Sequence, residues 1–135
     1  MFLLDTDALS ELEKPKPDSG LLGWLETVDW LDLHLSVITV GEIRAGIVKL
    51  SPGQKRRALE AMFDLLPDRF YNRILPVDFA IAVKFGELQS SLGPLPSLDT
   101  LIAATAIVKR LTLVTHNGKD MTRTGAPVFD PWTDK

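Results

Sequence analysis

Four acidic residues stand at positions where α/β proteins often carry out chemistry. Asp5 ends a short apolar run at the start of the chain, and Asp120 follows a predicted strand that ends at Thr115. Glu42 and Asp99 lie in the first turns of two predicted helices. Ligands of open parallel sheets bind outside the carboxyl ends of the strands, so side chains at these positions can converge on one rim. We therefore treat the four carboxylates as one candidate site.

Such a group of carboxylates would restrict the chemistry sharply. Several carboxylates cannot all stay ionised within a few ångströms of each other without a compensating cation. Ligation by oxygen alone selects hard ions, here Mg²⁺ or Mn²⁺. An ion of this kind activates water and neutralises the charge that develops on a phosphodiester during in-line displacement. The sequence therefore predicts metal-dependent phosphoryl chemistry that depends on acids and not on a serine or histidine.

Each acid also has a simpler structural explanation, which the sequence leaves open. Residues 39–42 match a capping box, in which Glu42 bonds back to the first amide of its helix. Asp5 can cap the helix that follows it. Asp99, like any acid in a first turn, is favoured by the helix dipole. Asp120 can bond the backbone of its own loop.

Strand and helix patterns alternate along the chain. The expected strands cover residues 2–5, 31–38, 73–77, 111–115 and 128–129, and a polar tail follows the last of them. The expected helices cover residues 7–14, 39–50, 52–66, 79–92 and 97–110, with one more capped by Asp18 or Ser19. This alternation predicts an α/β domain with a mainly parallel sheet. Because no internal repeat or linker is visible, residues 1–135 are expected to form a single domain.

The composition excludes several classes of protein. The chain has no cysteine, which excludes disulfides and thiolate metal sites. Asp5 interrupts the N-terminal apolar stretch, and no apolar run approaches the roughly 20 residues that span a bilayer. A cytoplasmic protein without a membrane association is therefore expected. The net charge of −3 is not that of a nucleic-acid coat protein. It does not exclude a nuclease, because bound cations restore positive potential locally.

Four sequence blocks occur in a fixed order, at residues 4–12, 36–46, 98–106 and 113–120. Together they resemble the blocks of PIN-domain proteins, and most closely those of the VapC-type toxins of bacterial toxin–antitoxin pairs. The resemblance implies a three-layer α/β/α fold and a Mg²⁺- or Mn²⁺-dependent endoribonuclease. It also implies an antitoxin that blocks the site, contact with DNA only indirectly through that antitoxin, and a toxin homodimer. We expect the helices of residues 39–66 to contribute to the dimer surface.

The resemblance also implies roles for individual residues. Asp5 and Asp99 match the principal metal-binding acids of the family. Glu42 and Asp120 match its other two acids, which are expected to complete the metal shell or to orient the attacking water. Polar positions around the site, and candidate contacts to the RNA backbone or to a partner, are Thr6, Arg44, Thr115, His116 and Asn117.

Two residues depart from the family pattern. Asp7 stands where the family usually has asparagine, and His116 where relatives often carry arginine. An extra carboxylate at Asp7 can add a metal ligand or repel phosphate, but the residue also fits the first turn of a helix with no further role. A histidine at residue 116 can contact phosphate, with a charge that depends on pH.

Two other functions compete with the nuclease. Asp5 and Asp7 also fit the Asp-x-Asp start of haloacid-dehalogenase-type phosphatases, in which the first Asp is a nucleophile. Leu9 departs from that motif, and we find no later lysine followed by a paired acidic motif. The other alternative keeps the PIN-like fold as a non-catalytic module that binds RNA or a partner protein. The presence of all four acids argues against it.

Overall fold

The computed structural model describes residues 1–93 and 95–133. Its centre is a sheet of five parallel strands in the order β3-β2-β1-β4-β5. The strands are β1 (Phe2–Leu4), β2 (Leu33–Ser36), β3 (Ile74–Leu75), β4 (Thr112–Val114) and β5 (Val128–Phe129). The predicted α/β fold with a parallel sheet is confirmed.

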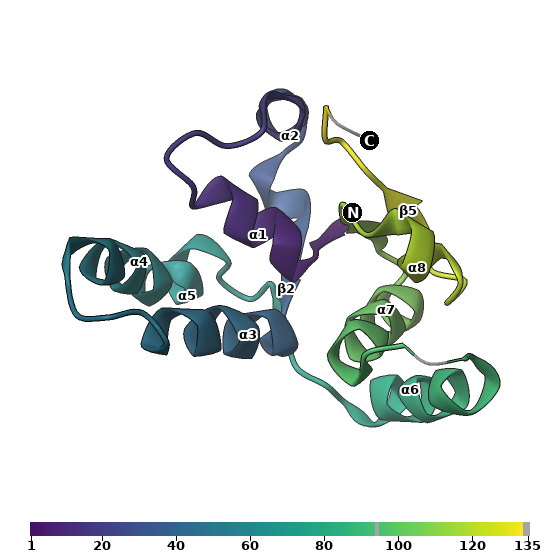
Figure 1. Ribbon diagram of the computed structural model, residues 1–135. Helices are drawn as coiled ribbons and strands as arrows, with labels where there is room; N and C mark the ends of the chain where they lie inside the picture. The colour runs from purple at the N-terminus through teal and green to yellow at the C-terminus, as the bar shows by residue number, and fades with distance from the viewer. Residues whose placement is uncertain (94, 134–135) are drawn as a thin grey trace.

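Helices flank this sheet, as the ribbon diagram shows (Figure 1). The first half of the chain contains α1 (Thr6–Leu12), α2 (Ser19–Leu25), α3 (Val37–Val48), α4 (Gln54–Asp64) and the short α5 (Leu66–Arg69). The second half contains α6 (Phe79–Ser91), α7 (Ser97–Lys109) and α8 (Gly118–Thr122). None of the helices in the described ranges is long and apolar enough to cross a membrane.

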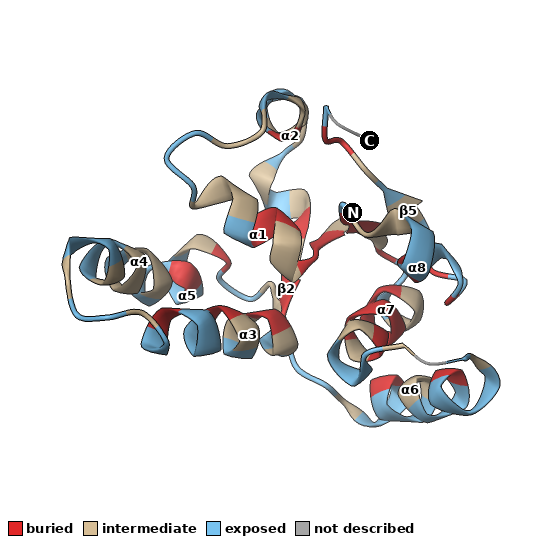
Figure 2. Ribbon diagram, viewed as in Figure 1, coloured by how far each residue is buried: buried red, intermediate tan, exposed pale blue. Residues whose placement is uncertain are grey.

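Side chains of the central strands alternate between the two faces of the sheet, as the two-residue period of a strand requires. Leu4 and Leu35 belong to one buried cluster with residues of α1, α2 and α3. Leu3 and Leu113 belong to a second cluster with residues of α7 and α8. The two clusters account for the buried stretches of these elements in Figure 2. Both faces of the sheet are therefore covered, which gives three layers.

The most apolar helix of the sequence, α7, lies between the sheet and α6. Ile102, Ala103 and Ala106 face the cluster on the sheet, while Ala104 contacts Ile81 and a leucine of α6. All four of these α7 residues are fully buried. The expectation that this helix is buried on most sides is confirmed, because the absence of a polar face leaves it no solvated side.

Two predicted boundaries around β2 are wrong. The expected strand of residues 31–38 is shorter, because residues 30–32 form a 3₁₀ turn and α3 already begins at Val37. Ser36 caps α3, since its hydroxyl accepts a hydrogen bond from the Ile38 amide at 3.0 Å. Thr39 therefore lies inside the helix, and the capping box expected at residues 39–42 does not exist. Glu42 lies in the second turn and is free to serve another purpose.

Other local expectations need smaller changes. The expected helix of residues 52–66 is divided into α4 and α5, and Pro67 lies in the first turn of α5, where a missing amide proton costs nothing. The turn expected after Thr115 continues into α8, so Asp120 lies in the first turn of a helix and not in a loop. Asp18 caps α2, as expected, by accepting a hydrogen bond from the Leu21 amide.

The C-terminal segment is part of the core and not the polar tail expected from the sequence. Trp132 is only 5% exposed and belongs to the buried cluster of α1, α2 and α3. The amide and hydroxyl of Thr133 donate hydrogen bonds to Asp18, the cap of α2. Gly20 allows this close approach, because a Cβ atom there would lie 2.4 Å from the Pro131 carbonyl oxygen. Residues 134–135 lie outside the described part of the chain.

Candidate active site

Asp5 lies at the end of β1, beside the end of β4, and is the most deeply buried acid of the predicted set. Its side chain is 5% exposed. Oδ1 accepts a hydrogen bond from the Thr6 amide at 2.7 Å, and Oδ2 accepts one from the Thr115 hydroxyl at 2.8 Å. Asp5 is therefore the cap of α1, as one alternative expected, and it also makes a long-range contact to the next strand of the sheet.

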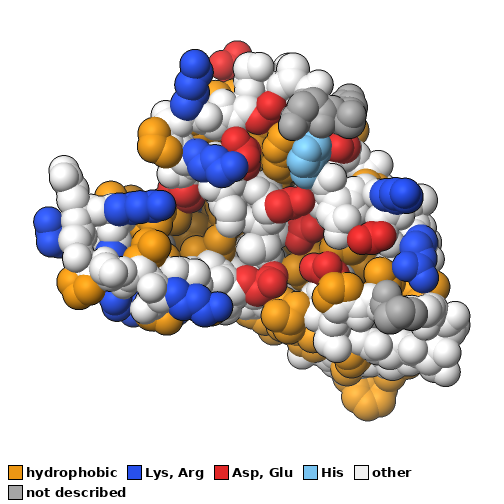
Figure 3. All heavy atoms as spheres, in the orientation of Figure 1, with side chains coloured by type: hydrophobic (Ala, Val, Ile, Leu, Met, Phe, Trp, Pro, Cys, Tyr) orange, Lys and Arg blue, Asp and Glu red, His pale blue; other side chains and the backbone are white. Residues whose placement is uncertain are grey.

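The other acids gather around Asp5, where acidic side chains cluster near the middle of the molecule in Figure 3. Burial raises the pKa of Asp5 to about 7, and the nearby charges of Asp7 and Asp99 add to the effect. Burial also raises the pKa of Asp99, with contributions from the charges of Glu42, Asp7 and Asp120. These interactions require that the carboxylates lie near one another. The structure thus brings together the four predicted acids and adds Asp7.

Glu42 reaches this cluster through a contact between two helices. The Thr6 hydroxyl of α1 donates to Glu42 Oε1 at 2.6 Å and also lies 3.1 Å from the Thr39 hydroxyl. Thr6, which directly follows Asp5, thus bonds two residues of α3, and the contact fixes the position of Glu42 relative to Asp5. The glutamate does not cap its own helix. Its orientation comes from tertiary packing, in which Thr6 lies beside it.

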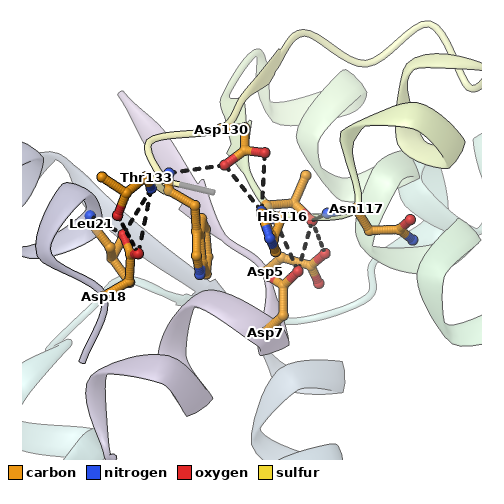
Figure 4. Close-up of polar contacts among 10 residues, drawn as sticks. Asp5, Asp7, Asp18, Leu21, His116, Asn117, Asp130 and Thr133 are labelled. Atoms are coloured by element: carbon orange, nitrogen blue, oxygen red, sulfur yellow. Dashed lines mark hydrogen bonds and ion pairs between the residues drawn. The ribbon is translucent and has the colours of Figure 1, made fainter. Parts of the chain in front are cut away.

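Asp7 lies in the first turn of α1, but its side chain points toward the loop after β4 (Figure 4). Its Oδ2 accepts a hydrogen bond from the His116 amide at 3.0 Å and lies 3.2 Å from the Thr115 hydroxyl. That hydroxyl also bonds Asp5, and its single proton can serve only one carboxylate at a time. Burial raises the pKa of Asp7. Within the described residues, its Oδ1 is buried without a hydrogen-bond partner.

Two site residues were not predicted from the sequence. Asp130 Oδ2 lies 3.1 Å from Nδ1 of His116, and the His116 ring stacks on Trp132 with 4.8 Å between centroids. Both partners come from the C-terminal segment. The only available signal was an acid and a tryptophan two residues apart in an otherwise short tail.

The remaining predicted residues fall into two groups. The Asn117 amide donates to the Thr115 hydroxyl at 3.0 Å, which places Asn117 at the edge of the cluster. Arg44 points elsewhere: its guanidinium lies 4.0 Å from Glu60 and 5.5 Å from the centre of the Phe63 ring, both on α4. The expected contact of Arg44 with substrate at the carboxylates therefore has no support in its position.

The donor set fits a hard divalent cation. All of the clustered ligand atoms are carboxylate oxygens, and no lysine or arginine of the described residues forms an ion pair with Asp5, Asp7 or Asp99. The described residues contain no preformed group of three or more side chains in metal-holding positions. Mg²⁺ usually keeps several waters and binds only one or two carboxylates, so it does not need such a cage.

The structure is that of an α/β protein with a parallel sheet and with acids from separate elements at one rim. Comparisons with known proteins identify the family. The PIN domain model matches residues 2–127, so the chain belongs to the PIN-domain family. Toxin FitB of Neisseria gonorrhoeae is 34% identical over 140 residues, which cover 99% of this chain and all of that protein. The crystal structure of FitAcB from the same bacterium has a TM-score of 0.91, with 33% identity and coverage of 98% and 99%.

Two further relatives extend this similarity. VapC ribonuclease Y4jK of Sinorhizobium fredii is 30% identical over 138 residues, which cover 98% of both chains. The structure of a toxin-antitoxin complex from Klebsiella pneumoniae contains a chain with a TM-score of 0.75 and 27% identity, with 98% of both chains covered. Because these relatives are matched over nearly their whole length, the similarity covers the complete PIN-domain unit.

Asp5→Asn is expected to stabilise the metal-free protein above neutral pH. The pKa of Asp5 is about 7 in the folded chain, against an ordinary value of 3.8. A raised carboxyl pKa contributes stability that is complete below about pH 4 and is lost as the pH rises toward about 7, because the folded state binds the proton more tightly than the unfolded state. Wild-type protein should lose stability between about pH 4 and 7, and Asp5→Asn should exceed it by about 2 kcal/mol above that window.

Urea unfolding in the presence of EDTA measures this difference. Asp7→Asn should give a gain of the same sign but smaller, because it removes a charge that raises the pKa of Asp5. Glu87→Gln is the control: that acid is 62% exposed beside Lys84, and its replacement should change stability by less than about 0.5 kcal/mol. A wild-type stability that increases with pH relative to Asp5→Asn would contradict the buried-charge interpretation.

Proposed function

We propose that this protein is a Mg²⁺- or Mn²⁺-dependent endoribonuclease and the toxin of a type II toxin–antitoxin pair. The observation that carries the proposal is the cluster of Asp5, Glu42, Asp99 and Asp120 at one rim of the sheet, with no lysine or arginine of the described chain paired to the buried acids. The names of the relatives, which include a toxin and a VapC ribonuclease, support this function. The PIN-domain match argues against the phosphatase alternative.

The chain's own residues have distinct tasks in this reaction. Asp5 and Asp99 hold the cation, directly or through water, while Glu42 and Asp120 complete the shell or orient the attacking water. The hydroxyls of Thr6 and Thr115 fix the carboxylates by donating to Glu42 and Asp5. A bound Mg²⁺ or Mn²⁺ supplies Lewis acidity, which lowers the pKa of water and neutralises charge on the scissile phosphate.

Asp99→Asn is expected to abolish RNA cleavage while the fold remains intact. Asp99 is only partly buried, and no side chain caps α7, so the neutral isostere leaves the helix unchanged. Loss of an acid that holds the cation should reduce cleavage by at least about 10- to 100-fold, the loss that is typical when a residue supporting a metal ligand is replaced. Cleavage of total cellular RNA with Mg²⁺ or Mn²⁺, followed by mapping of the new ends, measures the effect.

Glu87→Gln is again the matched control and should cleave RNA at the wild-type rate. EDTA should stop the reaction in both proteins. Cleavage that persists in Asp99→Asn and in Asp5→Asn would refute the assignment of the site. Metal binding without cleavage of any cellular RNA would instead support the non-catalytic binding module.

We further propose that the antitoxin binds in a groove that starts at the carboxylates. The groove has a volume of about 290 Å³ between α1, α3 and α4, and its polar lining residues include Glu42, Lys14 and Lys55. Its walls are mainly apolar, formed by Ile43, Ile47, Leu59 and Met62. An amphipathic segment suits such a groove and would bring a positively charged side chain against the acids. Contact with DNA would then be made by the antitoxin, and both proteins would meet in the cytoplasm.

The cognate antitoxin is expected to stop RNA cleavage when it is added in equimolar amount. Met62→Glu places a charge in the apolar wall of the groove and should weaken inhibition at least about tenfold, because an unpaired charge would be buried in the complex. Val48→Glu is the control, since Val48 lies on α3 outside the groove and is 47% exposed. Titration of the nuclease activity measures both. Equal inhibition of the two variants would place the antitoxin elsewhere.

The homodimer is proposed to form through the exposed face of α6. Phe79 is 85% exposed and Val83, one turn later, is 47% exposed. An apolar pair of this kind suits an isologous contact with a second copy. This face lies outside residues 39–66, which were expected to contribute.

Phe79→Ser is expected to convert the dimer to a monomer, because it removes the largest apolar contact of the proposed interface. Sedimentation equilibrium at micromolar concentration measures the change. Tyr71→Ser is the control: Tyr71 is 71% exposed, lies outside α6, and its replacement should leave the dimer intact. A wild-type monomer, or a dimer that survives Phe79→Ser, would exclude this surface.

A further inference from the structure

The C-terminal segment adds an aromatic wall to the edge of the carboxylate cluster, and the proposed reaction does not use this wall. The rings of His116 and Trp132 stack at an interplanar angle of 17°. Asp130 connects the two residues, because Oδ2 contacts His116 Nδ1 and Oδ1 accepts a hydrogen bond from the Trp132 amide at 2.9 Å. His116 thus has its ring fixed by two residues that come from outside its own loop, as Figure 4 shows for Asp130.

A pocket of about 240 Å³ opens between this wall and α1. Its lining residues are Asp7, Ser10, Glu11, Lys14, His116 and Trp132. Asp7 belongs both to the pocket and to the acidic cluster, because the Thr115 hydroxyl lies 3.2 Å from Asp7 Oδ2 and 2.8 Å from Asp5 Oδ2. A molecule in the pocket would therefore lie directly beside the site of cleavage.

The charges of the pocket favour a flat hydrogen-bonding group over a phosphate. Two of the lining residues are acids, and Lys14 is already paired with Glu11 at 2.9 Å. A phosphate would face carboxylates and find no uncommitted lysine. A nucleobase has N–H groups that can donate hydrogen bonds to carboxylate and hydroxyl oxygens. It also has a flat ring that can pack against aromatic side chains. Unpaired RNA bases are commonly recognised in this way by His and Trp.

We propose that this pocket binds one unpaired nucleobase of the RNA, next to the phosphate that is cleaved. The ring of His116 is the surface against which the base packs. The buried Trp132 stacks on that ring and supports it, and Asp130 is a positioning residue that holds His116 in place. The proposal deepens the nuclease function and rests on it. His116 stands where relatives often carry arginine. The proposal gives this difference a specific consequence, namely a preference for an unpaired base at one position of the substrate.

Oligonucleotides with a single abasic site, moved one position at a time around the mapped cleavage site, test this proposal. In the wild type, one abasic position should raise KM by about 5- to 100-fold with little change in kcat, the range expected for one base on an aromatic side chain. His116→Ala should raise KM on the intact oligonucleotide by a similar factor and should show no further loss at that position. His116→Phe should recover most of this loss, to about the KM of Asp130→Asn, because a flat ring remains although its contact with Asp130 is lost.

Two controls separate base packing from a structural effect. His34→Ala is the matched variant, since His34 lies in β2 and contacts the backbone of Phe2 at the opposite end of β1 from the acids. It should keep the wild-type abasic profile. Asp130→Asn should raise KM less than His116→Ala and lose sensitivity at the same position, whereas a general loss of stability would lower activity equally at all positions.

The outcomes distinguish this proposal from the nuclease function. The base pocket is refuted if the increases in KM caused by His116→Ala and by the abasic site multiply at every position. It is also refuted, and a phosphate contact replaces it, if His116→Arg restores KM where His116→Phe does not. If no RNA is cleaved at all, the same abasic series is used for binding to Asp99→Asn in Ca²⁺, measured by fluorescence anisotropy. Position-specific loss of binding that depends on His116 would then support the pocket even though the nuclease had failed, and uniform binding would refute it.

Discussion

The burial of one carboxylate, that of Asp5, between the two central strands is the constraint on which the site depends. A buried charge is costly unless it is paired or bonded. The Thr6 amide and the Thr115 hydroxyl each stabilise one oxygen, yet the pKa of Asp5 is still raised to about 7, chiefly by burial and further by the nearby charges of Asp7 and Asp99. Since no lysine or arginine of the described chain pairs with Asp5, the anion needs positive charge from outside the polypeptide. In the proposed reaction, a divalent cation would supply that charge together with the chemistry that phosphodiester hydrolysis requires.

Parallel strand topology explains how acids from distant segments reach Asp5. α1 and α3 begin directly after β1 and β2, and α7 returns along the sheet before β4, so all three helices begin at the rim formed by the carboxyl ends of the strands. Helix N-termini carry partial positive charge, which favours acids such as Asp99 in a first turn. The dipoles lessen the repulsion among the acids without removing it, because the pKa of Asp99 is still raised.

The C-terminal segment connects packing of the core to the surroundings of the acids. Trp132 fills a place in the core between α1 and α2, and Asp18 fixes the segment by accepting hydrogen bonds from Thr133. The same segment brings Asp130 to His116, whose amide in turn bonds Asp7. One stretch of chain therefore contributes to stability and also shapes the border of the acidic cluster.

The amino-acid sequence by itself determined the alternation of strands and helices, the parallel sheet and the four acids at element ends, because these follow from short-range periodicity and from the order of elements along the chain. The helix cap at Asp18 was also accessible, since a cap is a local contact. Only the tertiary structure decided the rest. It turned Glu42 from its own helix start toward Thr6, joined Asp7 to His116 across 109 positions of sequence, and placed Trp132 in the core. These contacts depend on which elements pack together in space, and a local pattern of residues does not specify which distant elements pack together.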